Sequence, residues 1–408
     1  MTWRTLNDVD FRGKRVIVRV DLNIPIEDGK AKNDRKIRES VPTIAYLIGA
    51  GAKVILMSHL DRPRGVPDPK YSLEPVSHVL AKVIKRKVKF VNDCVGPRVR
   101  ATVEGMKPRD ILLLENTRFH PEEERNDNAF ARELASLADV YVNDAFGTAH
   151  RAHASTHGIA RYLTGCVGFL MEREVESLST ILLSPGDMFT VVLGGAKVSD
   201  KVQILKNLVK KDLRTLIIGG GMAFTFIAAR GGRIGNSLVE KERIHDVNDI
   251  LATCRARKVD LVLPVDVVAA QRLEDGAPTR ICDANNIPDG WLGADIGPKS
   301  IELFTNKIKR STTIFWNGPM GAFERKGFST GTEAVAKAIA STKAFTVAGG
   351  GDTLRAIEES RLENEFSHVS TGGGASLEFL EGVELPGLSV LRKPEERVER
   401  LPYPSLPP

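Results

Sequence analysis

The sequence predicts an α/β fold with two doubly wound parallel-sheet domains joined by a helix. Two series of short β-rich apolar runs occur along the 408 residues, and amphipathic helical patterns separate most of these runs. Alternation of this kind is typical of βαβ units and therefore of parallel sheets. One charged-then-apolar segment lies between the two series, and the length is sufficient for two or three domains.

The predicted strands come in chain order as follows. The first series lies in RVIVRV from Arg15, KVILMS from Lys53, VKFV from Val88, DILLLE from Asp110 and DVYV from Asp139. The segment MEREVESLSTILLS from Met171 predicts a single connecting helix. The second series lies in FTVVL from Phe189, TLII from Thr215, DLVLPV from Asp260, TTIFW from Thr312, FTVA from Phe345 and HVS from His368.

These runs divide the chain into a first domain at residues 1–170, a connecting segment at 171–188 and a second domain at 189–377. We expect residues 378–408 to form a C-terminal segment that returns to the first domain. Its last part, RKPEERVERLPYPSLPP from Arg392, is charged and then rich in proline. That composition predicts an extended or disordered tail.

The net charge of +6 is concentrated in the first domain. Residues 1–170 contain 28 Lys and Arg against 21 Asp and Glu, a net charge of +7, whereas the rest of the chain has 30 against 31. A basic excess can serve nucleic acid, an anionic membrane surface or a small anionic substrate. The aromatic content of 6% disfavours nucleic acid, and the longest uncharged stretch, residues 215–229, is too short to span a membrane.

The cysteine pattern favours a reducing compartment. Cys94, Cys166, Cys254 and Cys282 include no CxxC pair, so we expect neither a disulfide framework nor a thiolate zinc site. The N-terminal residues show no apolar signal segment. Both observations favour a cytoplasmic protein.

Polar and cationic side chains follow the predicted strands of the first domain. Ligands of open α/β sheets bind beyond the carboxyl ends of the strands. Arg and His side chains there recognise carboxylates and phosphates through charge-assisted hydrogen bonds, so a small, strongly anionic ligand is expected. The residues are Asp21 and Asn23 in VDLNIP, His59 and Arg62 in SHLDRPRG, Arg118 in ENTRFH and Arg151 in NDAFGTAHRAH.

Glycine takes this place in the second domain. Gly194-Gly195 and the triple runs 219–221, 349–351 and 372–374 each follow an apolar run. Backbone amides at such strand-to-helix turns can hold an anion, which predicts a polyphosphate or nucleotide. Lys197 and Lys201 would share one helical face beside the first of these turns. Asp352 could hold a magnesium ion or cap a helix, and Thr353 could cap the helix or meet a phosphate.

A small anion in one domain and a nucleotide with a metal in the other favour phosphoryl transfer. The sequence has no GxxxxGK[ST], no HRD with a following Asn and no DFG, which excludes P-loop enzymes and protein kinases. GAGAKV from Gly49 fails the full GxGxxG pattern at Val54. Two rivals remain, an ATP-dependent enzyme acting on another carboxylate, and a nucleotide-binding or RNA-binding homologue with altered catalysis.

Nine segments resemble the signature blocks of the phosphoglycerate kinase family, in its order and approximate spacing from Asp21 to about Gly387. They are RVDLNIP, SHLDRP, LLENTRFHPEEE, NDAFGTAHRAHAST, GGAKVSDK, IGGGMAFTF, WNGPMGAFE, GGGDT and STGGGASLEFLEG. The resemblance implies two Rossmann-like domains joined by a helix and hinge, with 3-phosphoglycerate bound by the first and Mg-ADP or Mg-ATP by the second. It implies reversible phosphoryl transfer between 1,3-bisphosphoglycerate and ADP, in glycolysis, gluconeogenesis or carbon fixation, by a monomer that binds neither nucleic acid nor membrane.

The resemblance also implies roles for individual residues. For phosphoglycerate these are Asp21, Asn23, Lys36, His59, Arg62, Arg118 and Arg151. For the nucleotide they are Gly194, Lys197, Lys201, Gly219, Gly220, Gly293, Asn317, Pro319, Glu324, Gly350, Gly351, Asp352 and Thr353. Asp352 is the expected metal-associated carboxylate. Lys36, Lys197, Gly373 and Gly374 are the residues expected to act on the transferring phosphoryl group.

Two positions depart from the family pattern. Lys36 in DRKIRES stands where the family usually has arginine, with Arg35 and Arg38 as alternatives if the register differs. Lysine keeps the charge but loses the planar fork of arginine. Asp61 stands where the family normally has glycine, and a carboxylate beside an anion site should weaken substrate binding unless it faces away.

Overall fold

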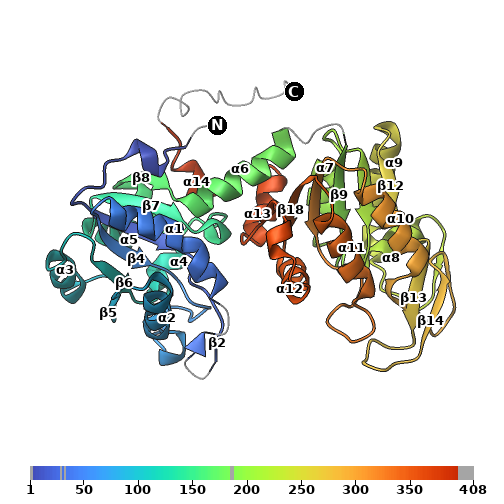
Figure 1. Cartoon of the computed structure of the whole chain (residues 1–408), viewed down its shortest axis with the longest axis horizontal. Helices are drawn as coiled ribbons and strands as arrows, with labels where there is room; N and C mark the ends of the chain where they lie inside the picture. Colours follow the sequence, from blue (N-terminus) through green and yellow to red (C-terminus); the bar gives the residue numbers. More distant parts are fainter. Residues whose placement is uncertain (1–2, 28–29, 32–33, 184–187, 394–408) are drawn as a thin grey trace, which may run out of the picture. The chain divides into compact units, whose positions relative to one another are not determined.

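The computed structural model describes residues 3–27, 30–31, 34–183 and 188–393, which form two compact units (Figure 1). Unit 1 comprises Met1–Val175 and Glu384–Pro408, and unit 2 comprises Glu176–Val383. The Pro-rich part of the predicted tail and residues 184–187 of the predicted connecting segment 171–188 lie outside the described residues. Among the residues described, no helix is long and apolar enough to cross a membrane.

Unit 1 is built around a six-stranded parallel sheet in the order β5-β6-β4-β1-β7-β8. The strands are β1 (Arg15–Val20), β4 (Lys53–Met57), β5 (Lys89–Val91), β6 (Ile111–Leu114), β7 (Val140–Asp144) and β8 (Thr164–Val167). The five predicted strands are confirmed, and β8 is an addition at the edge. Its sequence TGCV is short and contains glycine, so it gives little β-strand signal.

Helices cover this sheet because alternate strand residues are apolar on each face. Val16 and Val18 of β1 belong to one buried cluster with Ile44 of α1 (Arg35–Gly49) and Leu80 of α2 (Glu74–Ile84). The other helices are α3 (Pro97–Glu104), α4 (Pro121–Glu124) and α5 (Asn128–Ser136), with 3-10 turns η1 (Leu6–Asp8), η2 (Pro69–Tyr71), η3 (Thr117–Phe119), η4 (Phe146–Thr148) and η5 (Gly158–Arg161). A short hairpin pairs β2 (Ile26–Glu27) with β3 (Lys30–Ala31).

The C-terminal segment packs on unit 1 through backbone hydrogen bonds. The amide of Gly387, in α14 (Pro386–Ser389), donates to the carbonyl of Ala149 at 2.8 Å. The Asn143 side chain donates to the Gly387 carbonyl at 3.0 Å, and the Arg4 amide donates to the Leu391 carbonyl at 3.2 Å. The two ends of the described chain therefore lie in one unit.

The helix α6 (Phe169–Leu183) contains the boundary between the units, which falls between Val175 and Glu176. Its first turn is held by Asp144 at the end of β7, whose Oδ1 accepts the amides of Leu170 at 2.9 Å and Met171 at 3.3 Å. Burial raises the pKa of the Asp144 carboxyl to about 6, although these hydrogen bonds oppose the shift. The ionised form of Asp144 is thus costly in the folded chain.

Replacement of Asp144 by asparagine is expected to change how stability depends on pH. Because the folded pKa of about 6 exceeds the ordinary value of 3.8, the stabilisation from protonation is complete below about pH 4 and is lost as pH rises through 6. The wild type should therefore lose up to about 3 kcal/mol relative to Asp144→Asn between pH 4 and 7.5. Urea unfolding of both proteins across this range measures the difference, and a pH-independent difference would contradict the assignment.

Unit 2 contains a second six-stranded parallel sheet, in the order β12-β10-β9-β17-β18-β19. The strands are β9 (Phe189–Leu193), β10 (Thr215–Ile218), β12 (Asp260–Val262), β17 (Thr313–Asn317), β18 (Phe345–Gly349) and β19 (His368–Val369). All six predicted runs take part, and the doubly wound fold class is confirmed in both units. Ile314 and Trp316 of β17 share a buried cluster with Phe304 of α10 (Pro298–Ile308) and Val335 of α11 (Thr330–Ala340).

Unit 2 also has a small antiparallel sheet that the sequence analysis missed. The predicted run DLVLPV is broken by Pro264, so β12 ends at Val262 and a separate strand begins at Asp266. This sheet has the order β14-β13-β16, with β13 (Asp266–Ala270), β14 (Thr279–Asp283) and β16 (Leu292–Ile296), and β11 (Arg233–Ile234) pairs with β15 (Asn286–Ile287). The remaining elements are α7 (Val202–Leu208), α8 (Met222–Ala229), α9 (Ile244–Ala256), α12 (Gly351–Glu359), α13 (Gly374–Leu380), η6 (Lys241–Arg243) and η7 (Glu363–Glu365).

Candidate active site

Loops at the carboxyl ends of the strands in unit 1 are tied together by predicted site residues. The Asn23 side chain, after β1, accepts the amide of Asp61, after β4, at 2.9 Å. Arg118, in η3 after β6, donates from Nη1 to the Asp61 carbonyl at 2.7 Å. The backbone of Asp61 thus links Asn23 with Arg118, and all three lie at the same edge of the sheet.

Lys36 lies in the first turn of α1 and contacts the same edge. Its Nζ is 2.8 Å from Oδ2 of Asp21, which directly follows β1. Arg38, one of the alternatives for the transferring-group cation, instead forms an exposed pair with Asp34 at 2.6 Å. The structure therefore brings Lys36 and Asp21 together and places the Arg38 guanidinium on Asp34.

Asp61 adopts a left-handed backbone conformation, with φ of 51°. Glycine is favoured there, which gives the family's usual glycine a conformational reason, and aspartate tolerates the same region better than most residues. The Asp61 side chain is exposed, as is that of Arg62. The carboxylate is therefore in solvent next to the predicted anion site.

A buried arginine that the sequence analysis missed lies beneath this cluster. Arg19, the penultimate residue of β1, is 1% exposed and donates from Nε to Ser155 Oγ at 2.9 Å. Ser155 Oγ in turn donates to Glu123, which is fully buried. The one sequence signal for this buried pair was Arg19 itself, a charged residue inside the apolar run RVIVRV. Glu123 gave no signal, because it stands in a run of three glutamates.

Arg19 also determines the state of His59. Its Nη2 lies 3.0 Å from His59 Nδ1, and an arginine can only donate, so Nδ1 accepts and Nε2 carries the proton. Burial, followed by the nearby charges of Arg19 and Arg118, holds the pKa of His59 well below its ordinary value. His59 is thus a neutral imidazole with an N–H donor on Nε2.

Of the other cations of this region, Arg118 is buried and Arg151 is half-buried. Burial lowers the pKa of Arg118 to about 10, and its Nε lies 3.2 Å from Glu124. Arg151 donates from Nε to His150 Nε2 at 3.1 Å. Burial and then Arg118 lower the pKa of His153 to about 4. His59 and His153 are therefore neutral at pH 7, and the positive charge beside them is carried by Arg and Lys.

The glycines at the strand ends of unit 2 allow close backbone packing. A Cβ on Gly194 would lie 2.1 Å from the Pro319 carbonyl oxygen, and one on Gly219 would lie 2.4 Å from Met320 Sδ. The amides of Gly194, Gly219 and Gly220 donate to the carbonyls of Asn317, Leu193 and Met320 at 3.0, 2.8 and 3.0 Å. These three amides donate to backbone carbonyls of the protein, whereas the sequence analysis expected them to bind an anion.

Lys201 is a buried cation at the same strand ends. Its Nζ donates to the carbonyls of Gly194 at 2.6 Å and Asn317 at 2.8 Å, which joins β9 and β17. Burial lowers its pKa to about 8. The Lys197 side chain, four residues earlier, is exposed.

The turn between β18 and α12 is fixed by side chains of the predicted set. Asn317 donates from Nδ2 to the Gly349 carbonyl at 2.7 Å, and Thr353 Oγ1 accepts the Gly318 amide at 2.6 Å. Gly350 has φ of 95°, and a Cβ there would lie 2.7 Å from Asn317 Nδ2. Asp352 is the second residue of α12, where its carboxylate is exposed. The Gly372 amide donates to Ser370 Oγ at 3.1 Å, and α13 begins at Gly374.

A cavity of about 550 Å³ lies within unit 2 and joins the glycine turns to the small antiparallel sheet. Its predicted lining residues are Gly220, Gly293, Pro319, Glu324 and Asp352. Apolar residues that were not predicted line it too, including Phe224, Leu238 and Val267. Gly293 is needed for packing, because a Cβ would lie 2.0 Å from the Phe224 ring. The cavity therefore combines apolar walls with the carboxylates of Asp295, Glu324 and Asp352, as a nucleotide with a metal ion requires.

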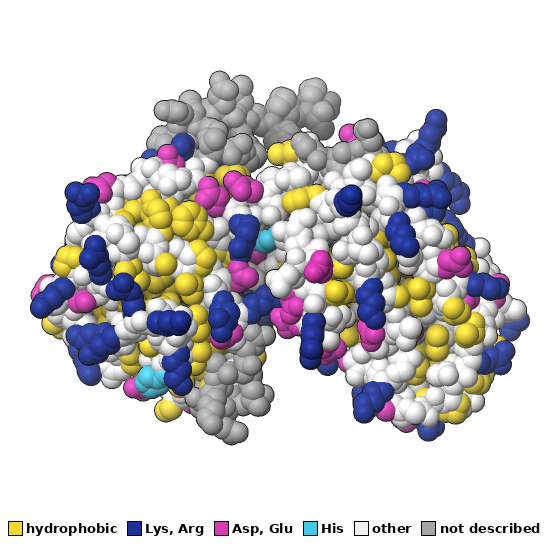
Figure 2. Space-filling view, viewed as in Figure 1, with side chains coloured by type: hydrophobic (Ala, Val, Ile, Leu, Met, Phe, Trp, Pro, Cys, Tyr) yellow, Lys and Arg dark blue, Asp and Glu magenta, His cyan; other side chains and the backbone are white. Residues whose placement is uncertain are grey.

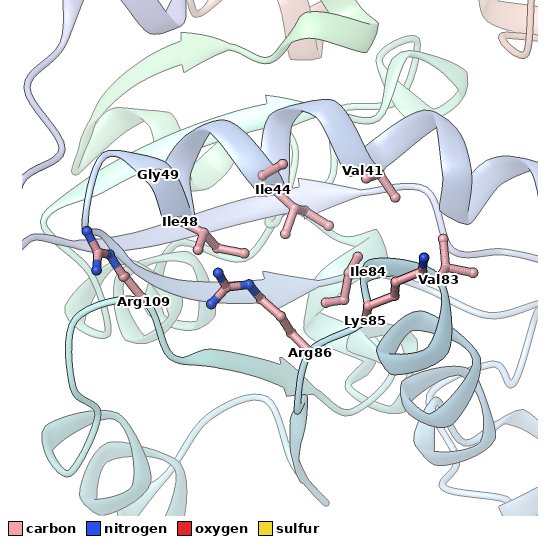
Figure 3. A pocket seen from close by; sticks show the side chains of 10 residues that line it. Val41, Ile44, Ile48, Gly49, Val83, Ile84, Lys85, Arg86 and Arg109 are labelled. Carbon is pink, nitrogen blue, oxygen red and sulfur yellow. The ribbon is translucent and has the colours of Figure 1, made fainter.

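A second cavity, of about 420 Å³, lies in unit 1 between α1 and the end of α2 (Figure 3). Ile44 and Ile48 point into it from α1, and Arg86 and Arg109 lie at its rim. On the face shown in Figure 2, Lys and Arg side chains surround a hydrophobic patch of unit 1. None of the predicted substrate residues lines this cavity. Part of the basic excess of unit 1 thus lies away from the predicted site.

Comparison with known proteins gives consistent results. A family model described as phosphoglycerate kinase matches residues 6–383. The phosphoglycerate kinase of Moorella thermoacetica is 50% identical over 387 residues, which cover 95% of this chain and 98% of the relative. That of Pelotomaculum thermopropionicum is 51% identical over 391 residues, which cover 96% and 99%. The expected alternative, a nucleotide-binding or RNA-binding homologue with altered catalysis, has no support among these relatives.

Solved structures agree with the sequence relatives. Phosphoglycerate kinase from Coxiella burnetii is 38% identical and superposes with a TM-score of 0.88, covering 98% of this chain and all of that one. The enzyme from Pyrococcus horikoshii OT3 is 33% identical, with a TM-score of 0.83 and coverage of 96% and 98%. The family match over residues 6–383 and the shared fold of both units show that this chain belongs to the phosphoglycerate kinase family.

Proposed function

We propose that the chain transfers a phosphoryl group reversibly between 1,3-bisphosphoglycerate and ADP, giving 3-phosphoglycerate and ATP, with the acids bound by unit 1 and the nucleotides by unit 2. Family membership makes the chain a phosphotransferase with a carboxyl acceptor. The observation that supports the division of labour is the cluster of cations and neutral histidines in unit 1, together with the cavity of nucleotide size in unit 2.

In unit 1, phosphoglycerate is held by Asp21, Asn23, Lys36, His59, Arg62, Arg118 and Arg151. The neutral His59 offers its Nε2 proton to a carboxylate or hydroxyl oxygen. Arg118 is fixed against Asp61, so its remaining N–H groups can meet an anion without a large loss of side-chain entropy. These contacts would give the acid one orientation and leave its transferable group accessible.

In unit 2, the nucleotide base fits the apolar part of the cavity beside Gly293, and Glu324 can accept hydrogen bonds from the ribose hydroxyls. The phosphates would be met by Lys197, Asn317, Pro319 and the turn Gly350 to Thr353. Gly194, Gly219, Gly220 and Lys201 would act by shaping this end of the sheet, since their amides or ammonium group are bonded to backbone carbonyls.

Magnesium fits Asp352 on the chemistry of the donor. Mg²⁺ is usually bound by one or two carboxylates, water and substrate phosphates, and Asp352 supplies one exposed carboxylate at the cavity. When bound, the ion would neutralise negative charge on the phosphates. Asp352 would position the nucleotide through that ion, while the exposed Lys197 is able to approach the same phosphates as a mobile charge.

Transfer needs little covalent chemistry from the protein, because it depends on positioning and charge stabilisation. Lys36 and Lys197 would stabilise the transferring group, and the turn Gly373-Gly374 would present backbone amides to it. The two substrates are bound by different units, so the hinge must close to bring them together.

Hinge closure is expected to make the chain more compact only when both substrates are bound. Small-angle scattering of the apo protein, the two binary complexes and the ternary complex would measure the radius of gyration. Equal dimensions in all four states would contradict closure.

A coupled assay tests the function directly. Formation of 1,3-bisphosphoglycerate from 3-phosphoglycerate and ATP should be saturable in both substrates and should require magnesium. Absence of activity over a range of salt concentrations would contradict the proposal.

The proposal includes a cytoplasmic monomer. Size-exclusion chromatography with light scattering tests the oligomeric state. The compartment is supported by the free thiols, which are compatible with reducing conditions and lie at Cys94, Cys166, Cys254 and Cys282.

Asp61→Gly is expected to lower KM for 3-phosphoglycerate about two- to fivefold with kcat unchanged. The reason is that repulsion between an exposed charge and a neighbouring anion weakens binding by up to about 1 kcal/mol. Glycine also accepts the left-handed backbone without strain. Asp61→Asn separates the two effects, since it removes the charge and keeps the conformation. Unchanged KM in both variants would show that the carboxylate does not act on the ligand.

A further inference from the structure

Three side chains of different metal-binding types meet near the carboxyl end of β5 in unit 1. The Asp93 carboxylate, the Cys94 thiol and the His120 imidazole have ligand atoms that all lie within 4.8 Å of one another. His120 Nε2 is 2.8 Å from Asp93 Oδ1. None of the three is among the residues proposed to bind phosphoglycerate or nucleotide.

The surrounding fold holds the three donors in place. Asp93 Oδ1 accepts the Cys94 amide at 2.7 Å, and the Asp93 carbonyl accepts the Glu115 amide at 3.3 Å. The His120 ring stacks on Phe130 with a centroid separation of 5.0 Å. Cys94 is fully buried, whereas the side chains of Asp93 and His120 are 47% and 30% exposed. The cluster is therefore organised on the protein side and open to water on the other.

The local charge favours a cation, although unit 1 as a whole is basic. The charges that act on the Cys94 thiol are those of the carboxylates Asp93, Glu123 and Glu115. Glu115 is held by Ser72 and the Leu73 amide, and Glu123 by Ser155, so both contribute charge without being free to bind the ion. Asp93 is left as the carboxylate ligand.

We propose that Asp93, Cys94 and His120 form a zinc-binding site, with a water molecule as the fourth ligand. Zinc prefers four-coordinate sites with thiolate, imidazole and carboxylate donors, while magnesium prefers oxygen donors. Sequence spacing did not reveal the site, because His120 lies 26 positions after Cys94 and approaches it only through the pairing of β5 with β6.

Binding requires only small movements and a simple proton balance. Ligand atoms around a tetrahedral zinc with these donors lie about 3.3 to 3.6 Å apart, so no pair within 4.8 Å must approach by more than about 1.5 Å. The His120 Nε2–Asp93 Oδ1 pair, at 2.8 Å, must separate by about 0.5 Å. Zn²⁺ forms a bond to Cys94 Sγ as the thiol proton leaves to solvent. It also bonds to His120 Nε2 in place of the proton that faces Asp93 Oδ1, and this one proton of the neutral imidazole moves through solvent to Nδ1. One proton is released per ion, so affinity should rise with pH.

Cobalt(II) provides a direct spectroscopic test of the site in the full chain. Titration of the reduced, metal-free protein with Co²⁺ in excess Mg²⁺ should produce an absorption band in the near ultraviolet from thiolate-to-cobalt charge transfer. The band should reach its full intensity at one equivalent of Co²⁺. Zn²⁺ should abolish this band stoichiometrically. Absence of the band, or its removal by Mg²⁺, would overturn the proposal.

Paired variants assign the ligands. Cys94→Ala should remove the charge-transfer band, whereas Cys282→Ala, at a half-buried thiol in unit 2, should retain it. His120→Gln should weaken zinc binding in equilibrium dialysis by at least about 100-fold. Its control is His245→Gln, since His245 lies 3.6 Å from Asp249 in an exposed pair without a thiol.

Circular dichroism checks that each variant is folded, and His120→Gln, at a partly exposed side chain, keeps the test valid if Cys94→Ala does not fold. A band that survives in Cys94→Ala, or zinc affinity unchanged in His120→Gln, would overturn the site.

Discussion

Arg19→Met is expected to lower the free energy of unfolding of unit 1 by about 3–5 kcal/mol, the largest stability effect expected of any single substitution considered for this chain. The reason is the partner that remains. Glu123 is fully buried, and burial already raises the pKa of its carboxyl, which the charge of Arg19 opposes. Without Arg19, the Glu123 charge lacks its nearest compensating cation, and Ser155 loses a donor.

The double variant Arg19→Met/Glu123→Gln is the informative comparison. If the cost arises from an uncompensated buried charge, removal of both charges should restore most of the lost stability. Urea unfolding followed by circular dichroism would measure the transition, with attention to separate transitions of the two units. A single variant that loses less than about 0.5 kcal/mol would show that the Arg19 charge is not needed by the fold.

The same substitution has a separate effect on the substrate site. Arg19 is the donor to His59 Nδ1, so its loss allows the proton to occupy either ring nitrogen. The KM for 3-phosphoglycerate should therefore rise even in conditions where Arg19→Met is fully folded. Nitrogen chemical shifts of His59 would report the tautomer directly.

Much of this architecture could be predicted because the strands are rich in β-branched residues and buried on both faces. All eleven predicted runs take part in sheets. Two of the missed strands lack this signal, since β8 is TGCV and β16 is LGADI. The strand β13, DVVAA, contains two valines but begins at Asp266, directly after the predicted run DLVLPV ends at Val265. The position of a strand in the fold decides which strands it pairs with, so the sequence of β13 by itself carries no information on its antiparallel partners.

The candidate site could be predicted to the extent that it depends on strand ends. Polar residues after parallel strands meet at one edge, and this rule found Asp21, Asn23 and Arg118 without any structure. It could not find Arg19, which lies inside a strand, or the apolar wall at Phe224 and Val267, which comes from two elements remote in sequence. The glycine turns were predicted because their amides could bind an anion. In the structure, several of these amides instead donate to carbonyls of neighbouring strands.

Lys36→Ala is expected to lower kcat by about 100- to 1000-fold, because loss of one preorganised charge on a developing anion typically has that effect. Lys36 Nζ is held by Asp21 at 2.8 Å, on a side chain that is about one-third exposed. The ammonium group is therefore anchored at the site and remains accessible to a ligand. A group that acts on the transferring phosphoryl group should change kcat more than KM.

Lys36→Arg and Arg38→Ala separate charge, geometry and register. Arginine keeps the charge and adds a planar fork, so Lys36→Arg should retain at least wild-type turnover. Arg38→Ala should change kcat less than twofold, because Arg38 is exposed and paired with Asp34 four residues earlier. If Lys36→Ala were active while Arg35→Ala or Arg38→Ala were inactive, the transferring-group cation would be a neighbour of Lys36. The Asp21–Lys36 pair would then serve only to hold the start of α1 against β1.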